Sequence, residues 1–250
     1  MEKEKEVTLF ITSCGRPQLL KQTLDSFVKY NTYPIKEVIL CEDSGIPNIV
    51  DFAKNILPYP IIFCYNQIRM GQMKTIEKYT QLIKTQYVFH LEDDYEFFDS
   101  GFIELSFKIM DTDPKISQVL LEDEQYTYPK IDIGNPLCYK LMTNKPGEIT
   151  ANNCDGPLTI FSWRPSLKRI EIQKLRMPYQ PWDDEYTIQL RVNKLGYYSV
   201  VTKNIKNGRL GFCTHIGKNF HVPENFRQIK IIGRSDFPDK RYIRLKDILD

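Results

Sequence analysis

The chain has 250 residues and a mass of 29.5 kDa, which is the upper end of what one hydrophobic core usually covers. Hydrophobic residues make up 42% and charged residues 26%, a balance that excludes disordered, collagen-like and coiled-coil proteins. The chain carries 34 basic and 32 acidic side chains, a formal charge of +2. We therefore expect no nucleic-acid partner, because the bulk charge does not attract a polyanion.

The apolar pattern and the cysteines indicate the compartment. No apolar run approaches the roughly 20 residues that cross a bilayer, although peripheral contact with a membrane stays open. The N-terminus alternates acidic and basic residues, unlike a secretory signal. The six cysteines stand singly, without a C-x-x-C pair, as buried, reduced thiols do. We expect a cytoplasmic, soluble protein and leave its oligomeric state open.

The first part of the chain alternates short apolar runs with segments of helical period. Pro17 suits a first helical turn, and apolar residues recur at helical spacing after it. Strands that alternate with helices predict βαβ units and a mostly parallel sheet. The expected strands are 7–12, 37–41, 60–65 and 87–91, with helices after Pro17 and over 73–85.

Beyond about residue 98 the pattern is less regular. We expect a helix around 102–110, a strand at 116–121 and irregular structure over the Pro-, Tyr- and Asn-rich stretch 122–157. A later helix begins at Asp183, with Ile188, Val192 and Leu195 on one face, and Gly196 stands where a left-handed C-terminal cap belongs. A strand at 197–202 and a basic, loop-like tail from 208 follow. No repeat or linker divides the chain, so one α/β domain is expected.

Two of the predicted strands end in carboxylates. One leads into Glu42 and Asp43, and another into Glu92, Asp93 and Asp94. Ligands of open α/β sheets bind beyond the carboxyl ends of the strands. Three adjacent acids after a buried strand are costly unless a divalent cation, which prefers oxygen ligands, neutralises them. The alternative is that the acids solvate a turn or cap a helix, for which one carboxylate is enough.

These features, in this order, resemble family 2 glycosyltransferases of GT-A fold. The acids after the fourth strand are similar to the DXD motif of that family, with Glu92 in place of its first Asp. A weaker similarity lies near His215. The matching segments are 7–17, 38–45, Asn66 with Gly71, 91–94, and 181–185 followed by Leu190, Arg191 and Gly196.

The resemblance implies a GT-A fold, an α/β architecture with a mixed, mostly parallel sheet flanked by helices. It implies a nucleotide-binding half (1–98), an acceptor-binding half (99–205) and a C-terminal loop or tail (206–250). The implied reaction moves a sugar, with inversion, from a nucleotide-diphosphate donor, with a UDP-sugar favoured. The acceptor is a hydroxyl of a glycan, a lipid-linked or a protein acceptor. Mn²⁺ or Mg²⁺ would stabilise the leaving diphosphate.

The resemblance also assigns residues to the metal and the donor. Asp94 is the direct metal ligand, and His215 is a third ligand or an ordinary loop histidine. Glu92 reaches the donor ribose, or the metal through water, whereas Asp93 contacts the donor or points away as a capping carboxylate. Asp43 accepts a hydrogen bond from the ring N–H of uracil or thymine. The full donor set is Thr12, Arg16, Asp43, Gly71, Glu92 and Asp93, with Arg16 alternatively a surface residue at a helix start.

The acceptor hydroxyl must lose its proton as it attacks, so a positioned carboxylate base is required. Spacing from Arg191 aligns Glu185 with the family's base, whereas residue type favours Asp184, and both stay open. The same acids suit the N-terminus of a helix through its dipole. Trp182 stacks on a sugar or packs in the core, and Asp155 falls where family members contact the acceptor or donor sugar.

Two other interpretations are kept. A catalytically inactive sugar- or nucleotide-binding relative is compatible with Glu92 in the DXD position. A sugar-phosphate nucleotidyltransferase would need a Gly-rich loop with a basic residue after the first strand, of which 13–16 is a thin version. His90, inside an apolar strand, is expected to be a core histidine with its hydrogen bonds satisfied.

Overall fold

The computed structural model describes residues 5–121, 130–142, 161–180, 183, 185–206 and 209–217. The strands are β1 (Val7–Ser13), β2 (Glu37–Glu42), β3 (Ile61–Tyr65), β4 (Tyr87–Glu92), β5 (Tyr95–Phe97), β6 (Ile116–Leu120), β7 (Lys130–Ile131), β8 (Cys138–Leu141), β9 (Ser166–Arg169), β10 (Tyr198–Thr202), β11 (Ile205–Lys206), β12 (Arg209–Leu210) and β13 (Cys213–His215). The helices are α1 (Pro17–Tyr30), a 3-10 turn (Asp51–Asn55), α2 (Gln72–Thr80), α3 (Phe102–Met110), α4 (Ile170–Leu175) and α5 (Glu185–Asn193).

Nine of these strands form one sheet in the order β3-β2-β1-β4-β9-β6-β10-β8-β7. β1 lies parallel between β2 and β4, and β3 is parallel to β2. β9 runs antiparallel to both β4 and β6, and β8 is antiparallel to both β10 and β7. Within the described part of the sheet, β8 and β9 therefore run against the other strands. The expected mixed, mostly parallel sheet is confirmed.

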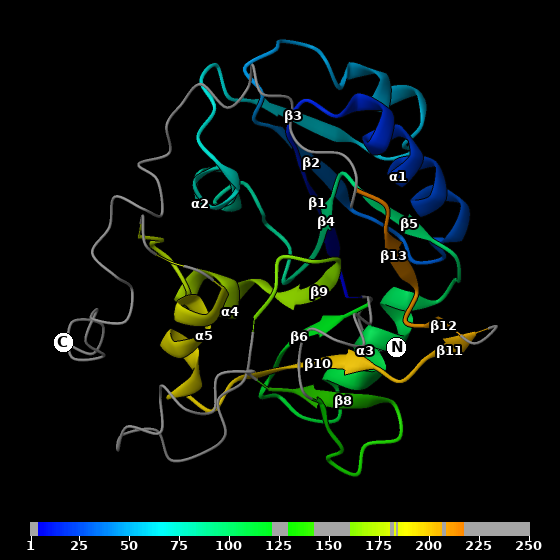
Figure 1. Cartoon of the computed structure of the whole chain (residues 1–250), viewed down its shortest axis with the longest axis vertical. Helices are drawn as coiled ribbons and strands as arrows, with labels where there is room; N and C mark the ends of the chain where they lie inside the picture. Colours follow the sequence, from blue (N-terminus) through cyan, green and yellow to red (C-terminus); the bar gives the residue numbers. More distant parts are fainter. Residues whose placement is uncertain are drawn as a thin grey trace.

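Helices cover both faces of the sheet because successive residues of a strand point to opposite sides. Leu9 of β1 packs in a core with Leu24 of α1 and Phe102 of α3. Its neighbour Phe10 belongs to a second core that includes Ile76 of α2 and Ile188 of α5. Figure 1 shows the same division, with α1 and α3 on one side of the sheet and α2, α4 and α5 on the other. A strand buried on both faces reads as a continuous apolar run.

Several expected boundaries are wrong. The second helix ends at Thr80 rather than 85. The chain continues in turns whose hydrogen bonds join residues three positions apart, and Ile83 in these turns is buried. β7 and β8 lie inside the stretch 122–157 that was expected to be irregular. Leu195 is 49% exposed, since α5 ends at Asn193 and turns away before the left-handed Gly196. The rest of 122–157 lies largely outside the described residues.

Candidate active site

The carboxyl ends of β1, β2 and β4 meet at one edge of the sheet. Thr12 is the partner of Glu92 in the β1–β4 register, and Ser13 is the partner of Glu42 in the β1–β2 register. The acids that follow β2 and β4 therefore lie beside the loop that joins β1 to α1. This is the edge at which ligands of α/β sheets bind.

Asp93 points toward the loop after β1. Its carboxylate accepts hydrogen bonds from the Ser13 hydroxyl (3.1 Å), the Cys14 amide (3.3 Å) and the Arg16 guanidinium, with which it also forms an ion pair. Burial raises the pKa of Asp93 to about 6, although Arg16 acts in the opposite direction. Asp93 thus fixes this loop against β4 instead of pointing away as a capping carboxylate.

Asp94 lies between Arg16 and His215. Its Oδ2 atom accepts hydrogen bonds from Arg16 Nη1 (2.8 Å) and His215 Nε2 (3.1 Å). Burial alone would raise the pKa of Asp94, but the His215 hydrogen bond and the Arg16 charge outweigh it, so the pKa is lowered. The structure therefore brings together three of the predicted site residues, and Arg16 is no mere surface residue.

A two-stranded ribbon brings His215 to this place. β13 pairs antiparallel with β5, and His215 faces Tyr95, the residue that follows Asp94. The expectation of a late loop at His215 is wrong, because the residue ends a strand. The next turn returns to the acid, since the Ile216 amide donates to the Asp94 carbonyl oxygen (2.8 Å).

Gly217 touches the Asp94 side chain and carried no signal in the sequence. A Cβ atom on Gly217 would lie 2.2 Å from Asp94 Oδ2 and 2.8 Å from Asp94 Cβ and Cγ. No real side chain fits in such a space, so the backbone approaches the carboxylate as closely as only glycine allows.

Replacing Arg16 with methionine should lower the free energy of unfolding by about 3 kcal/mol, because it leaves Asp93 buried without its cation. The Arg16 and Asp93 side chains are only 18% and 2% exposed. Urea denaturation measures the change. Lys21→Met is the matched control, since it breaks an exposed ion pair with Asp25 (2.6 Å) and should cost below about 0.5 kcal/mol. Equal losses for the two variants would contradict the assigned role of Arg16.

Glu92 connects the end of β4 with the helix α2. Its Oε1 atom accepts a hydrogen bond from Gln72 Nε2 (2.6 Å), at the start of α2. Burial, followed by the negative charges of Asp94, Asp93 and Glu185, raises the pKa of Glu92 to about 7. The charge of Glu185 thus acts on Glu92 although 93 positions separate the two residues in the sequence. The two carboxylate clusters are therefore near enough for their charges to interact.

Asp43 holds the loop that precedes α2. It accepts hydrogen bonds from the Asn66 side chain (2.8 Å), the Met70 amide (2.7 Å) and the Gly71 amide (2.7 Å). Gly71 has a φ of 85°, which glycine adopts without strain. These bonds give Asp43 a structural role in a loop that lies more than 20 residues away in the sequence.

The second cluster lies at the start of α5. Asp183 is buried and forms an ion pair with Arg191 (2.5 Å), which fixes the first turn. Glu185 Oε1 accepts hydrogen bonds from the Ser162 hydroxyl (2.9 Å) and the Trp163 amide (2.8 Å). The other candidate base, Asp184, and the predicted acceptor residues Trp182 and Asp155 lie outside the described residues.

A buried lysine lies behind these acids. Lys168 of β9 is 1% exposed, and its Nζ atom is 3.2 Å from His90 Nδ1. Burial and the charge of Arg176 lower the Lys168 pKa well below its usual range, whereas Glu92 and Glu185 act in the opposite direction. His90 also contacts the Thr12 hydroxyl (3.4 Å), so it is the satisfied core histidine that was expected.

Asp94 and His215 fit a divalent cation. A hydrogen bond joins Asp94 Oδ2 to His215 Nε2, with 3.1 Å between the two atoms. A cation bound between these atoms would take the place of the hydrogen. Among the described residues, no three His, Cys, Asp or Glu side chains form a metal-binding group. Such an ion would therefore take its remaining ligands from substrate oxygens and water, as ions bound with phosphates do.

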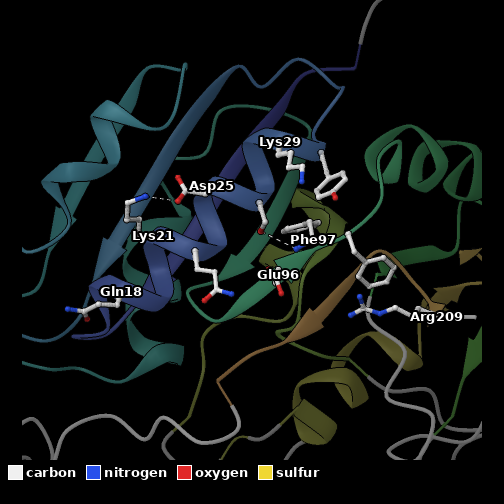
Figure 2. A pocket seen from close by; sticks show the side chains of 11 residues that line it. Gln18, Lys21, Asp25, Lys29, Glu96, Phe97 and Arg209 are labelled. Atoms are coloured by element: carbon white, nitrogen blue, oxygen red, sulfur yellow. Dashed lines mark hydrogen bonds and ion pairs between the residues drawn. The ribbon is translucent and has the colours of Figure 1, made fainter. Parts of the chain in front are cut away.

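A separate hollow of about 500 Å³ lies between the outer face of α1 and Phe97 and Phe98 (Figure 2). Its cations are already engaged. Lys21 pairs with Asp25 (2.6 Å), and Arg209 lies over the Phe98 ring (4.0 Å). These two cations thus already contact groups of the protein itself, which distinguishes the hollow from the acid-rich edge.

Within the described residues, no helix is both long enough and apolar enough to cross a bilayer.

Solved structures share this fold. A mannosyltransferase, PcManGT from Pyrobaculum calidifontis in complex with GDP-Man and Mn²⁺, aligns with a TM-score of 0.57 and 13% identity, over 83% of this chain and 59% of that one. GalNAc-T7 with UDP, GalNAc and Mn²⁺ aligns with a TM-score of 0.57 and 15% identity, over 84% and 46%. S. aureus TarS 1–349 in complex with UDP-GlcNAc gives 0.53 and 9%, over 88% and 63%. The chain thus spans less than two thirds of each of these proteins, and the fold is that of GT-A glycosyltransferases.

The sequence profile described as Glycosyl transferase family 2 matches residues 8–163, which is more than half of the chain. The chain therefore belongs to glycosyl transferase family 2, and the family and enzyme class expected from the sequence are confirmed. No curated protein matches the chain.

Proposed function

We propose that the chain is a metal-dependent, inverting glycosyltransferase that moves a sugar from a nucleotide-diphosphate donor, with a UDP-sugar favoured, to an acceptor hydroxyl. The observation that supports the proposal is the approach of the two carboxylate clusters: the Trp163 amide bonds to Glu185 (2.8 Å), and the centroid of the Trp163 ring lies 5.7 Å from that of His90, two residues before Glu92. Metal and donor at one cluster would face a base at the other. The acceptor is a glycan, a lipid-linked or a protein hydroxyl.

Asp94 and His215 are the proposed metal ligands. Their mixed oxygen and nitrogen donor set favours Mn²⁺ over Mg²⁺, which prefers oxygen ligands alone. When bound, the ion supplies Lewis-acid stabilisation of the leaving diphosphate. The Mn²⁺ in the structures of PcManGT and GalNAc-T7 supports this choice.

Arg16 is proposed to neutralise the diphosphate, because its guanidinium is held at the acids by Asp93 and Asp94. Glu92 is assigned to the ribose, in line with Thr12 on the neighbouring strand. Asp43 and Gly71 are assigned to the nucleobase. They are joined by a hydrogen bond (2.7 Å) that orders the loop before α2.

Glu185 or Asp184 is proposed as the general base. The acceptor oxygen forms its bond to the anomeric carbon while the bond from that carbon to the diphosphate oxygen breaks, and the hydroxyl proton passes to the carboxylate. A single displacement of this kind inverts the anomeric centre without a covalent intermediate. Trp182 and Asp155 are proposed to contact the acceptor or the sugar.

An inactive, nucleotide-binding relative is the second candidate. It is favoured by one observation: Arg16 and His215 both already bond to Asp94 Oδ2. This arrangement would let a charged cluster persist as a structural unit without metal.

Donor binding tests both candidates. UDP, GDP, UDP-GlcNAc and GDP-mannose are each added with MnCl₂ or with EDTA, and the melting temperature is measured. A ligand at about 100 times its Kd adds about 2.7 kcal/mol, or roughly 5–10 °C for a chain of this size. We expect this shift for one nucleotide class, in the presence of Mn²⁺ alone, together with release of free nucleotide from the sugar donor. Stabilisation without release would favour the inactive relative, and no shift at all would contradict both.

The location and partners follow from the chemistry proposed. The five described cysteines are free thiols, which suits a reducing cytoplasm, and we propose that location. We propose no nucleic-acid partner.

A further inference from the structure

We propose that Ser162 and Gln118 are positioning residues that orient Glu185, and that Glu185 rather than Asp184 is therefore the general base. This inference rests on the proposed function. It concerns residues on the loop before β9 and on β6, neither of which the family resemblance or the sequence pattern indicated.

The carboxylate of Glu185 is fixed by two donors on one oxygen. Ser162 Oγ and the Trp163 amide both bond to Oε1, at 2.9 and 2.8 Å. Ser162 Oγ also accepts a hydrogen bond from the Arg164 amide (3.4 Å), so its own hydrogen is directed at Glu185. Two donors on one oxygen set the rotation of the carboxylate as well as its place.

Gln118 fixes the loop that supplies these donors. Its Nε2 atom donates to the Ser162 carbonyl oxygen (2.5 Å), and its Oε1 atom accepts from the Ser162 amide (3.3 Å). The Gln118 side chain therefore bonds to both the carbonyl oxygen and the amide of Ser162, whose hydroxyl donates to Glu185. The loop cannot shift along the sheet without breaking both bonds.

The other two bonds of Gln118 anchor it within the sheet. Nε2 also donates to Ser166 Oγ of β9 (2.9 Å), and Oε1 accepts from Ser199 Oγ of β10 (3.2 Å). All four side chains of this network, Gln118, Ser162, Ser166 and Ser199, are fully buried. The amide of Gln118 thus donates two hydrogen bonds through Nε2 and accepts two through Oε1. With all four bonds made, the orientation of the group is fixed.

Burial of so many polar groups on one sheet face is costly unless every group is bonded. An apolar residue at Gln118 would fill the same space between Lys168 and Ser199, its partners in the register of β9 and β10. The network instead runs unbroken from β10 through Gln118 and Ser162 to the acid at the start of α5. A chain of hydrogen bonds that ends at the Glu185 carboxylate holds this group in one position, as residues that support a reactive group do.

Glu185 also lies among the charges of the site. Lys168 of β9 and Glu92 of β4 both interact with it electrostatically, and Asp183 precedes it at the start of α5. Two neutral donors from the 162–163 loop hold Oε1 among these charges. The geometry thus favours a defined direction for the proton acceptor.

The first test removes the hydroxyl alone. Ser162→Ala should lower kcat on the order of 10- to 100-fold, because a misdirected base costs that much, while the donor KM stays unchanged. Ser162→Thr keeps the hydroxyl and should restore most of kcat. Ser106→Ala is the matched control, since Ser106 is a fully buried serine of α3 whose hydroxyl bonds only to the Phe102 carbonyl among the described groups (2.7 Å); it should leave kcat unchanged. The assay follows nucleotide release to water from UDP-GlcNAc or GDP-mannose, whichever stabilises the protein.

The second test is a double-mutant cycle. Glu185→Gln should lower kcat by a factor on the order of 10² to 10⁴, and adding Ser162→Ala or Gln118→Leu should lower it no further, because residues that act as a unit are not additive. Independent, multiplicative losses would overturn the positioning role. Full activity of Glu185→Gln with an inactive Asp184→Asn variant would overturn the choice of base while the transferase stands. Absence of nucleotide release by the wild-type protein would instead refute the proposed function itself.

Discussion

Replacing Asp94 with alanine is expected to abolish Mn²⁺-dependent nucleotide release while the protein stays folded. The change removes the carboxylate that shares a hydrogen with His215, and with it the anionic ligand proposed for the metal. Lewis-acid stabilisation of a leaving diphosphate amounts to several kcal/mol, so we expect a loss of at least about 10³-fold in kcat. The measurement is nucleotide release against MnCl₂ concentration, with EDTA as the blank.

Asp99→Ala is the control for this loss. The side chains of Asp99 and Asp94 are similarly buried, 10% and 9% exposed, and each forms an ion pair. Asp99 pairs with Lys206 of β11, a strand that pairs antiparallel with β12. Removing it should cost stability but leave the response to Mn²⁺ intact. Activity of Asp94→Ala that persists in EDTA would refute the metal site.

Gly217→Ala is expected to impair the site almost as severely, by adding one methyl group. The new Cβ would stand 2.2 Å from Asp94 Oδ2, and the carboxylate is already held by Arg16 and His215. Either the carboxylate rotates away from His215 or the turn after β13 moves. In both cases the two proposed ligands separate, and we expect the Mn²⁺-dependent thermal shift to vanish and nucleotide release to fall about 10²-fold or more.

Gly134→Ala separates this steric effect from the ordinary cost of replacing a glycine. A Cβ at Gly134 meets no atom within 4 Å, and its φ of 74° places the cost in the backbone alone. That variant should lose roughly 1 kcal/mol of stability and keep its activity. A Gly217→Ala protein that binds Mn²⁺ normally would show that the turn yields without disturbing Asp94.

The sequence predicted the first half of the fold well because its strands are buried on both faces. Continuous apolar runs such as 7–12 and 87–91 leave little choice of structure, and both strands are confirmed, each extended by one residue. The sequence did not predict β9, because that strand contains Lys168 and a lysine is usually a surface residue. The lysine is buried by contacts with His90 and by the rings of Phe161 and Trp163, and sequence patterns do not reveal such pairings.

The candidate site was predictable where acids follow strands and unpredictable where distant segments approach. Asp94 stands at a strand end, so its place followed from the fold. Its contact with Gly217 arises because the backbone at Gly217 approaches the Asp94 side chain closely. No local sequence pattern indicates such an approach. The sequence did not indicate Gln72 and Gln118 for a similar reason. Amide side chains follow no characteristic spacing, and the roles of these two come from the groups they bond to in the fold, Glu92 and Ser162.

The pairing of β13 with β5 joins residues 121 positions apart in the sequence, Asp94 and His215. Contacts between such distant segments form late, since the entropy of closing the intervening loop is lost before they contribute. We therefore expect the central sheet, whose strands lie before residue 203, to form before this ribbon. We expect the proposed metal site to be completed only after β13 has paired with β5, because that pairing brings His215 to Asp94.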